Sequence, residues 1–273
     1  MNAYQRFRGV LPEYIAERGF LKELEKGYSW RVLGAAGTGS YGKAYLVQDR
    51  ATQNIFILKR LRKRKWGKKT ALQAFLEEQE LLKKLQHPSF PEYIEGGCIN
   101  GIPYFIMERK AGRTIEELLF EDGMAFTEKE AFQLGTELLA LIVCLHACGI
   151  SHRDIRLPNI LLDQGRISII DFGLACSLEV QEERKGHPRD YTNHLSDLYL
   201  LGHFILFLLY ANFAPSGTFG SKSWEEELEL TEKSRMIIKT LLLAEGEYPS
   251  ARSALEEIQL HIKETWGEEH GVF

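Results

Sequence analysis

Residues 152–173 read HRDIRLPNILLDQGRISIIDFG, and this stretch decides the fold of the chain. Two apolar runs, Ile160–Leu162 and Ile167–Ile170, flank a glycine-containing turn, which predicts a short β-hairpin. Asn159 precedes the first strand and Asp171 follows the second, so strand pairing places these two residues side by side. An amide oxygen and a carboxylate so placed form a hard-oxygen site suited to Mg²⁺ that bridges phosphate groups.

Asp154 lies one loop away from this hairpin and can accept or orient the proton of a hydroxyl group. The tripeptide His152-Arg153-Asp154, then Asn159, and then Asp171-Phe172-Gly173 follow one another in a fixed order. A chance occurrence of all these parts in this order is remote, so the stretch predicts a phosphate-handling site.

A glycine-rich segment, Gly37-Thr38-Gly39-Ser40-Tyr41-Gly42, is predicted between two short strands near the start of the chain. Glycines allow backbone amides to approach phosphate oxygens closely. Dinucleotide-binding folds use the same spacing at a strand-to-helix turn, whereas here an apolar strand follows. By itself the segment also fits an ordinary glycine-rich hairpin.

Lys59 ends a third predicted strand, and a helix is predicted to follow over residues 70–86. Glu78 lies on the same face of that helix as Phe75 and Leu82. Because a buried, unpaired carboxylate is costly, Glu78 needs a cationic partner, and Lys59 is the natural candidate.

The wider pattern predicts an α+β, bilobal chain with a small five-stranded lobe that carries one helix, followed by a mainly helical lobe. Loosely helical spacing, broken at Gly19, indicates a helical extension over residues 1–27. The first lobe is expected over residues 28–108 and the second over residues 109–273, together forming one catalytic domain. The second lobe contains the hairpin and predicted helices over residues 127–148, 195–211, 231–244 and 250–264.

These motifs, in this order, resemble the eukaryotic-type protein kinase family over residues 28–264. The resemblance implies ATP bound beneath the glycine loop, Mg²⁺ held by Asn159 and Asp171, and a catalytic Asp154. It also implies that Lys59, paired with Glu78, holds the α- and β-phosphates. The implied nucleotide-binding residues are Gly37, Thr38, Gly39, Ser40, Tyr41, Gly42, Ala44, Ile57, Lys59, Met107, Glu108, Lys110, Leu161 and Asp171. By the same resemblance, Met107 lies at the back of the adenine pocket, and the backbone of Glu108 and Lys110 forms hydrogen bonds with adenine. Asp197 is implied to start the central helix and to anchor the catalytic loop. Its position also suits a helix N-cap.

Two substitutions depart from the family pattern around the nucleotide. Arg156 occupies a place near the γ-phosphate where Ser/Thr kinases usually have lysine, and it keeps the positive charge in a larger, forked group. Ala44 replaces the usual valine, and Ile57 replaces the usual alanine. The two substitutions together move a similar side-chain volume from one strand to its neighbour. The adenine pocket is therefore expected to be reshaped rather than lost.

The segment from Asp171 to Asp197 is short for the family and contains no A-P-E sequence. Tyr248 stands where the arginine that pairs with the A-P-E glutamate would lie, so both partners of a buried ion pair are absent together. Arg153 remains able to bind a phosphorylated residue of this segment. The nearby candidates for such a modification are Ser177, Tyr191 and Thr192, although all three can equally stay unmodified.

The leading prediction is a Ser/Thr-type protein kinase that acts on a protein substrate. A small-molecule or lipid kinase of related fold is a second hypothesis, because the platform for a peptide substrate is reduced. A non-catalytic nucleotide-binding scaffold is a third, although such proteins usually lack a catalytic residue and this chain lacks none.

Composition and charge bear on location and partners. The net charge of −4 does not match nucleic acid or acidic membranes, but the run Lys59–Lys69 is strongly basic. It is interpreted as a solvated loop or as a docking site for an acidic partner. The spacing of the four cysteines suits buried thiols rather than a zinc site. With neither a secretory leader nor a transmembrane segment predicted, a cytoplasmic protein is expected.

Overall fold

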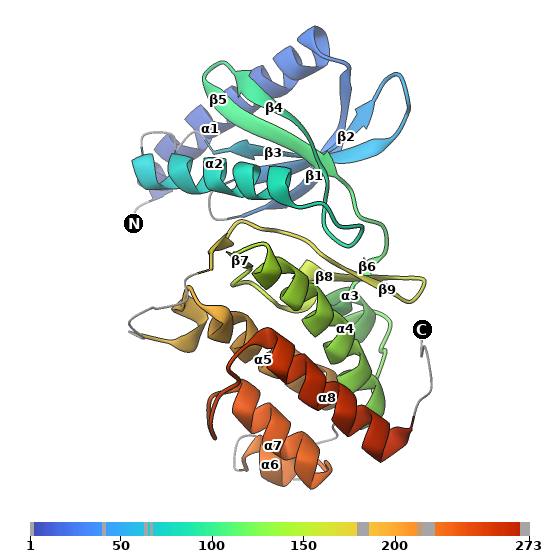
Figure 1. Cartoon of the computed structure of the whole chain (residues 1–273). Helices are drawn as coiled ribbons and strands as arrows, with labels where there is room; N and C mark the ends of the chain where they lie inside the picture. Colours follow the sequence, from blue (N-terminus) through green and yellow to red (C-terminus); the bar gives the residue numbers. More distant parts are fainter. Residues whose placement is uncertain are drawn as a thin grey trace. The chain divides into compact units, whose positions relative to one another are not determined.

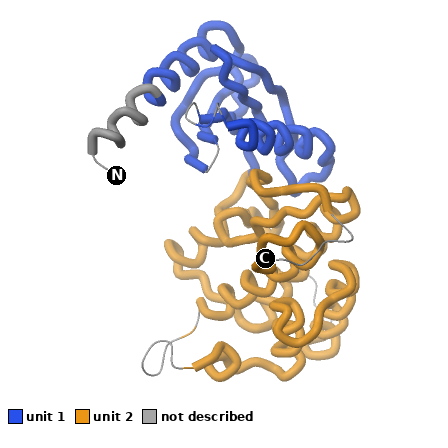
Figure 2. Tube along the Cα trace, turned by 90° about the vertical axis from the view of Figure 1, so that its left-hand side faces the viewer, with its two compact units in different colours: residues 1–110 blue, residues 111–273 orange. Residues whose placement is uncertain are grey.

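The computed structural model describes residues 3–39, 42–62, 65, 68–178, 186–211, 213 and 222–267, with side chains from residue 13 onward. The chain forms two compact units, residues 1–110 and 111–273 (Figure 2). The fold is α+β, with a five-stranded antiparallel sheet in the first unit and a mainly helical second unit.

Unit 1 is built on a sheet with the strand order β1-β2-β3-β5-β4. The strands are β1 (Trp30–Thr38), β2 (Gly42–Asp49), β3 (Ile55–Leu61), β4 (Tyr93–Ile99) and β5 (Ile102–Glu108). β1 extends into the glycine-rich segment, because Gly37 and Thr38 still pair with Ala44 and Lys43 across the hairpin. The glycine-rich segment therefore begins inside a strand.

Two helices cover opposite faces of this sheet, α1 (Ala3–Gly27) and α2 (Lys69–Lys84) (Figure 1). α1 runs without interruption through Gly19, where a break was predicted. Glycine disfavours a helix interior by about 1 kcal/mol, but Phe20 and Leu24 of α1 are fully buried against the sheet. Tertiary packing of these side chains outweighs the local preference.

Unit 2 contains two small sheets and a set of helices. The strands β6 (Arg113–Thr114), β8 (Ile160–Asp163) and β9 (Arg166–Ile169) form one sheet, and β7 (Ile150–Ser151) pairs with β10 (Cys176–Ser177) in the other. The helices are α3 (Ile115–Phe120), α4 (Glu128–Ala147), α5 (His194–Tyr210), α6 (Trp224–Glu227), α7 (Glu232–Leu241) and α8 (Ala251–Trp266), with 3₁₀ turns at Leu157–Asn159 (η2) and Pro188–Asp190 (η3).

β6 and α3 were not predicted, although a local signal marks the start of α3. Thr114 and Glu117 form a capping box, in which each side chain accepts a hydrogen bond from the backbone of the other. Gly112, just before β6, has a φ of +102°, and a Cβ there would lie 2.5 Å from the carbonyl oxygen of Leu162. A glycine is therefore required where the chain passes against β8.

The four cysteines are free thiols, but they are not buried as predicted. Cys98 and Cys148 are exposed, and Cys144 and Cys176 are partly exposed. On α4 the buried face is formed by residues such as Leu138, Ile142 and Leu145, and the helical period turns Cys144 and Cys148 away from it.

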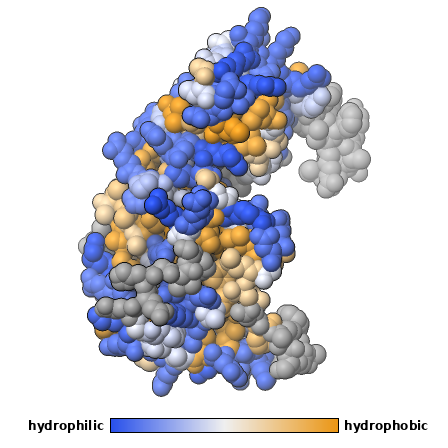
Figure 3. All heavy atoms as spheres, turned by 90° about the vertical axis from the view of Figure 1, so that its right-hand side faces the viewer, coloured by the Kyte–Doolittle hydropathy of each residue, from blue (hydrophilic) through white to orange (hydrophobic). Residues whose placement is uncertain are grey.

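Among the described residues, α4 is the one helix that has the length and apolar composition to cross a membrane. Half of that stretch is buried inside the structure, where α4 packs against α5 and α8. A core helix meets the same criteria, so α4 gives no clear sign of a membrane span. Hydrophilic residues cover much of the face drawn in Figure 3, with apolar residues in separate patches.

Candidate active site

One face of the unit 1 sheet gathers several residues that the sequence assigned to the nucleotide. Ala44 of β2 lies directly opposite Lys59 of β3, and Ile57 of β3 lies opposite Met107 of β5. Directly opposed residues in antiparallel strands project from the same face, as do residues two apart on one strand. Ala44, Ile57, Lys59 and Met107 therefore share one face of the sheet.

Lys59 and Glu78 form the ion pair that the sequence analysis expects. Lys59 Nζ donates a hydrogen bond of 2.6 Å to Glu78 Oε1, and both side chains are largely shielded from water. Phe75 of α2 stacks against Phe105 of β5, which lies opposite Lys59, so aromatic packing fixes α2 on this face. The ammonium group is thus held at a defined place above the strand.

The glycine-rich segment closes the hairpin between β1 and β2. Gly39 N donates a hydrogen bond of 3.0 Å to Gly42 O. A Cβ at Gly42 would lie 3.0 Å from the carbonyl oxygen of Arg60, so a side chain there would push β2 from β3. Ser40 and Tyr41, which the sequence also assigned to the nucleotide, lie outside the described residues.

Glu108 is the last residue of β5, and Lys110 lies two residues later, at the end of unit 1. Glu108 N donates to Glu92 O at 2.8 Å, so the backbone N–H of Glu108 already has a partner within unit 1. The Lys110 ammonium donates to Pro88 O and to the carboxylate of Glu108. These bonds connect the end of β5 to the segment that precedes β4.

In unit 2 the loop after β7 holds Asp154 between two partners. Asn159 Nδ2 donates to Asp154 Oδ2 at 2.7 Å and to the Asp154 backbone oxygen at 2.9 Å. Arg156 Nε lies 3.1 Å from Asp154 Oδ1, while most of the Arg156 side chain stays accessible. Asp154 and Asn159 are both buried, so the orientation of the carboxylate is fixed by the loop itself.

The hairpin β8–β9 brings Asn159 and Asp171 to the same end, as predicted from its symmetry. Ile160 pairs with Ile169, and Ile170 N donates to Asn159 O at 2.9 Å, which continues the ladder by one residue. Asp171, the next residue, has a φ of +64°, in the left-handed region that non-glycine residues rarely adopt. Backbone strain of this kind accumulates at functional positions.

The amide oxygen of Asn159 and the carboxylate of Asp171 thus lie at the same end of the hairpin, and both are oxygen groups of the kind that Mg²⁺ prefers. The amide nitrogen of Asn159 is engaged with Asp154, so its oxygen points away from that residue. Within the described residues, no group of three or more His, Cys, Asp or Glu side chains is arranged to hold a metal. Mg²⁺ commonly binds to only a few protein groups, all of them oxygen ligands. It completes its coordination shell with water and with the phosphates of the substrate.

Asp197 anchors the loop that carries Asp154. Its carboxylate accepts hydrogen bonds from the backbone N–H groups of His152 and Arg153, at 2.9 and 2.7 Å, and from Ser151 Oγ at 3.0 Å. Complete burial raises its pKa, but the bonds with His146 and the Arg153 backbone prevail and hold the pKa below its usual value. The carboxylate stays charged inside the protein.

The alternative interpretation of Asp197 as a helix N-cap is wrong. Asn193 caps α5, its side chain accepting from Leu195 N at 3.0 Å, and Asp197 lies within the helix. His146 and Ser151 were not identified from the sequence as its partners. They are distant along the chain and carry no local motif, so only the fold reveals their role.

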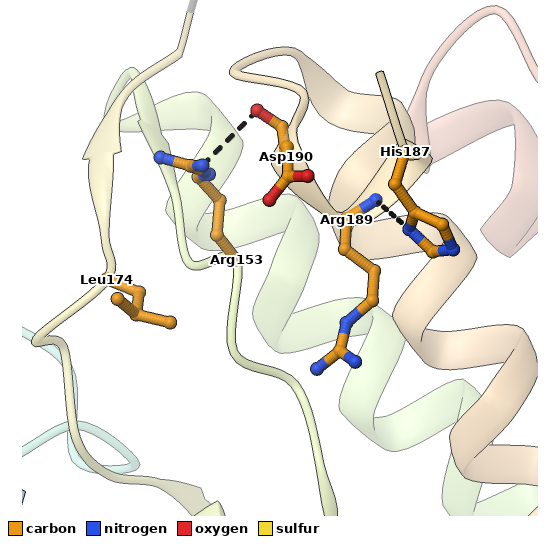
Figure 4. A pocket seen from close by; sticks show the side chains of 5 residues that line it. All are labelled: Arg153, Leu174, His187, Arg189 and Asp190. Carbon is orange, nitrogen blue, oxygen red and sulfur yellow. Dashed lines mark hydrogen bonds between the residues drawn. The ribbon is translucent and has the colours of Figure 1, made fainter. Parts of the chain in front are cut away.

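Arg153 lies beside a pocket of about 400 Å³ lined by Arg153, Leu174, His187, Arg189 and Asp190 (Figure 4). Arg153 Nη2 donates to the backbone oxygen of Asp190 at 3.2 Å. Two guanidinium groups and an imidazole beside one carboxylate make the lining rich in hydrogen-bond donors. A phosphate group is one ligand that such a lining suits.

The basic run Lys59–Lys69 is not one continuous loop. Lys59 and Arg60 belong to β3 and are both paired, and Arg60 is completely buried. The alternation of a strand places these neighbours on opposite faces, a signal that the count of basic residues concealed. Lys63, Arg64, Trp66 and Gly67 lie outside the described residues.

Comparison with known proteins agrees with this geometry. Residues 30–199 match the family described as "Protein kinase domain". The chain is 36% identical over 256 residues to the Bacillus subtilis protein named "Probable serine/threonine-protein kinase YbdM", which covers 93% of this chain and 97% of that protein. It is 30% identical over 151 residues to the Arabidopsis thaliana "Serine/threonine-protein kinase AtPK2/AtPK19", covering 55% of this chain and 32% of that protein.

Proposed function

This chain belongs to the protein kinase family, and on that premise we propose that it transfers the γ-phosphoryl group of Mg·ATP to Ser or Thr hydroxyls of a protein substrate. One observation carries the proposal. The buried carboxylate of Asp154 accepts a hydrogen bond from Asn159, and Asn159 lies at the same end of the β8–β9 hairpin as Asp171. Phosphoryl transfer requires chiefly such positioning and charge neutralisation.

We assign the nucleotide to the shared sheet face of unit 1. Ala44, Ile57 and Met107 offer apolar surface to adenine, and the backbone of Glu108 and Lys110 offers hydrogen bonds. Backbone amides of Gly37–Gly42 bind phosphate oxygens, and Lys59, oriented by Glu78, neutralises the α- and β-phosphates.

We assign the transfer step to unit 2. Asp154 accepts a hydrogen bond from the acceptor hydroxyl and orients its oxygen toward the γ-phosphorus, and Arg156 compensates charge on the γ-phosphoryl group. Magnesium, held by Asn159 and Asp171, would supply electrostatic stabilisation of the phosphates. The O–P bond to the acceptor forms as the bond to the β-phosphate oxygen breaks, and the hydroxyl proton leaves through Asp154.

The test is transfer of label from γ-labelled ATP, with Mg²⁺, to the protein itself and to a generic protein acceptor. We expect label on phosphoserine or phosphothreonine, lost in Asp154→Ala and in Asp154→Asn. Both variants should still bind ATP, which is measured as the increase in the unfolding temperature that ATP causes. Bound ATP without label on any protein would contradict the proposal and favour a small-molecule acceptor or a scaffold.

We also propose that the pocket beside Arg153 receives a phosphorylated residue of the segment after Asp171. Ser177 is exposed, next to Cys176, whose sulfur lies 3.9 Å from Arg153 Nη1. Tyr191 and Thr192 follow η3 and are partly exposed. Mass spectrometry after incubation with Mg·ATP should find phosphate on one of these three residues, and unmodified peptides would refute the idea.

We propose, finally, a cytoplasmic location and an acidic partner for the basic residues that follow β3. The four free thiols fit a reducing compartment, which cell fractionation would test. Binding to polyglutamate that weakens with salt and is lost when residues 62–65 become alanine would support the partner. Salt-insensitive binding, or none, would refute it.

A further inference from the structure

A partly buried ionic network lies on the face of the unit 1 sheet opposite Lys59, and it joins α1 to β2 and β3. Glu17 of α1 accepts from Lys43 Nζ and from the Tyr45 hydroxyl, each at 2.5 Å. Glu13 of α1 accepts from Arg60 Nη2 at 3.0 Å, and Glu17 lies 3.6 Å from the same nitrogen. Two carboxylates of one helix thus bind two cations of neighbouring strands.

The two cations are next to the residues assigned to phosphate. Lys43 follows Gly42 directly, and Arg60 follows Lys59 directly. Lys43 and Arg60 also lie opposite each other in the β2–β3 ladder. Lys43 and Arg60 therefore connect α1 to the two strands at the positions next to Gly42 and next to Lys59.

Arg60 is the least replaceable member of the network. Its side chain is fully buried, with the guanidinium 5.7 Å from the Phe20 ring centre and Nε bonded to the Tyr45 oxygen at 3.2 Å. A buried cation requires its anions, so Arg60 holds α1 in one register along the strands. Burial raises the pKa of Glu17, but the bonds from Lys43 and Tyr45 prevail and keep that pKa below its usual value.

The network is more than is needed to attach the helix. Phe20 and Leu24 already bury α1 in an apolar cluster with Trp30, Val47 and Leu58. A buried ion pair is weak evidence for stability, because desolvation offsets its attraction, and its better-attested effect is to fix a register. The charges on α1 are therefore better explained by the position that they impose on β2 and β3.

We propose that Glu17 and Glu13 are positioning residues for nucleotide binding, which act through Lys43 and Arg60 to hold the glycine loop and Lys59 in place. This inference rests on the proposed function. α1 forms ion pairs with β2 and β3 on one face of the sheet, while Glu78 of α2 orients Lys59 on the other face (Figure 1). The N-terminal helix is thus part of the phosphate-binding apparatus.

The experiment compares wild type with Glu17→Gln, which removes the charge and keeps the shape, and with Lys43→Met. The matched control is Glu23→Gln, an exposed carboxylate on the same helix. Binding of a fluorescent ATP analogue with Mg²⁺, which does not depend on transfer, is measured beside KM and kcat. We expect Kd and KM for the nucleotide to rise about tenfold in both test variants, with kcat much less affected and Glu23→Gln unchanged.

The double variant Glu17→Gln/Lys43→Met should bind no more weakly than either single one, because the residues act through one contact. Folded variants with wild-type nucleotide affinity, or losses that add in the double variant, would overturn the inference while leaving the kinase assignment intact. A wild type that binds no Mg·ATP would overturn both. If Glu17→Gln fails to fold, the nucleotide affinity of Lys43→Met is the deciding measurement. In that variant Arg60 still has both of its carboxylate partners, Glu13 and Glu17.

Discussion

Asn159 donates a hydrogen bond from its amide to the carboxylate of Asp154 at 2.7 Å, so the residue that we assign to magnesium also orients the carboxylate that we assign to catalysis. The two assigned roles are joined in one side chain. Substitution of Asn159 should therefore affect both metal dependence and transfer.

Asn159→Ala should lower kcat by about 10²–10³-fold, the usual loss when one preorganised polar group is removed from an active site. The Mg²⁺ concentration for half-maximal activity should rise at the same time. Steady-state transfer assays over a magnesium series measure both effects. Asn54→Ala, at an exposed asparagine, is the matched control, and activity within threefold of wild type in Asn159→Ala would contradict the assignment.

Asp197→Asn should destabilise the protein by about 2–4 kcal/mol, because Asp197 is fully buried and is bonded to His146, Ser151 and two backbone N–H groups. An amide nitrogen in its place cannot accept these bonds. Urea unfolding measures the change. Asp163→Asn, at the exposed last residue of β8, should stay within about 0.5 kcal/mol of wild type, and equal losses in the two variants would refute the anchoring role.

Gly112→Ala should cost more stability than Gly123→Ala, although both glycines have positive φ. A Cβ at Gly112 would lie 2.5 Å from Leu162 O, whereas a Cβ at Gly123 meets no atom within 4 Å. We expect a loss of about 1 kcal/mol at Gly123 from backbone strain alone. At Gly112 the clash with the backbone should add about 2 kcal/mol to that loss. Thermal unfolding of the two variants measures the difference, and a larger loss in Gly123→Ala than in Gly112→Ala would contradict the prediction.

His261 should make the stability of the protein depend on pH in mild acid. Burial lowers its pKa below the ordinary value of 6.5, and its ring bonds Ser234 Oγ at 2.7 Å and Thr265 Oγ1 at 3.0 Å. Below pH 6.5 the unfolded chain takes up a proton that the folded ring resists, so the free energy of unfolding falls as the pH falls. Above that value both states are neutral and the effect is absent.

The measurement for His261 is the free energy of unfolding between pH 7.5 and about pH 5.5, in wild type and in His261→Gln. Glutamine keeps hydrogen-bonding groups but does not titrate in this range. Wild type should therefore lose stability more steeply than the variant. Parallel curves would show that His261 does not contribute the predicted dependence.

Local sequence determined the hairpin and the residues at its open end. The register Ile160↔Ile169 follows from two apolar runs around one turn, and it fixes the nearness of Asn159 and Asp171. The pair Lys59–Glu78 was also predictable, because an acidic residue on an apolar helix face requires a cation. In both cases short-range periodicity carries the information.

Tertiary structure alone decided that Arg60 is buried and which residues pair with Arg60 and Asp197. Arg60 looks in the sequence like one more residue of a basic run, yet it is enclosed by Glu13 and Glu17 from a helix far along the chain. Asp197 likewise finds His146 and Ser151 only when α4, β7 and α5 pack together. Periodicity assigns a side chain to a face, but its partner across that face depends on how distant elements dock, which no local pattern records.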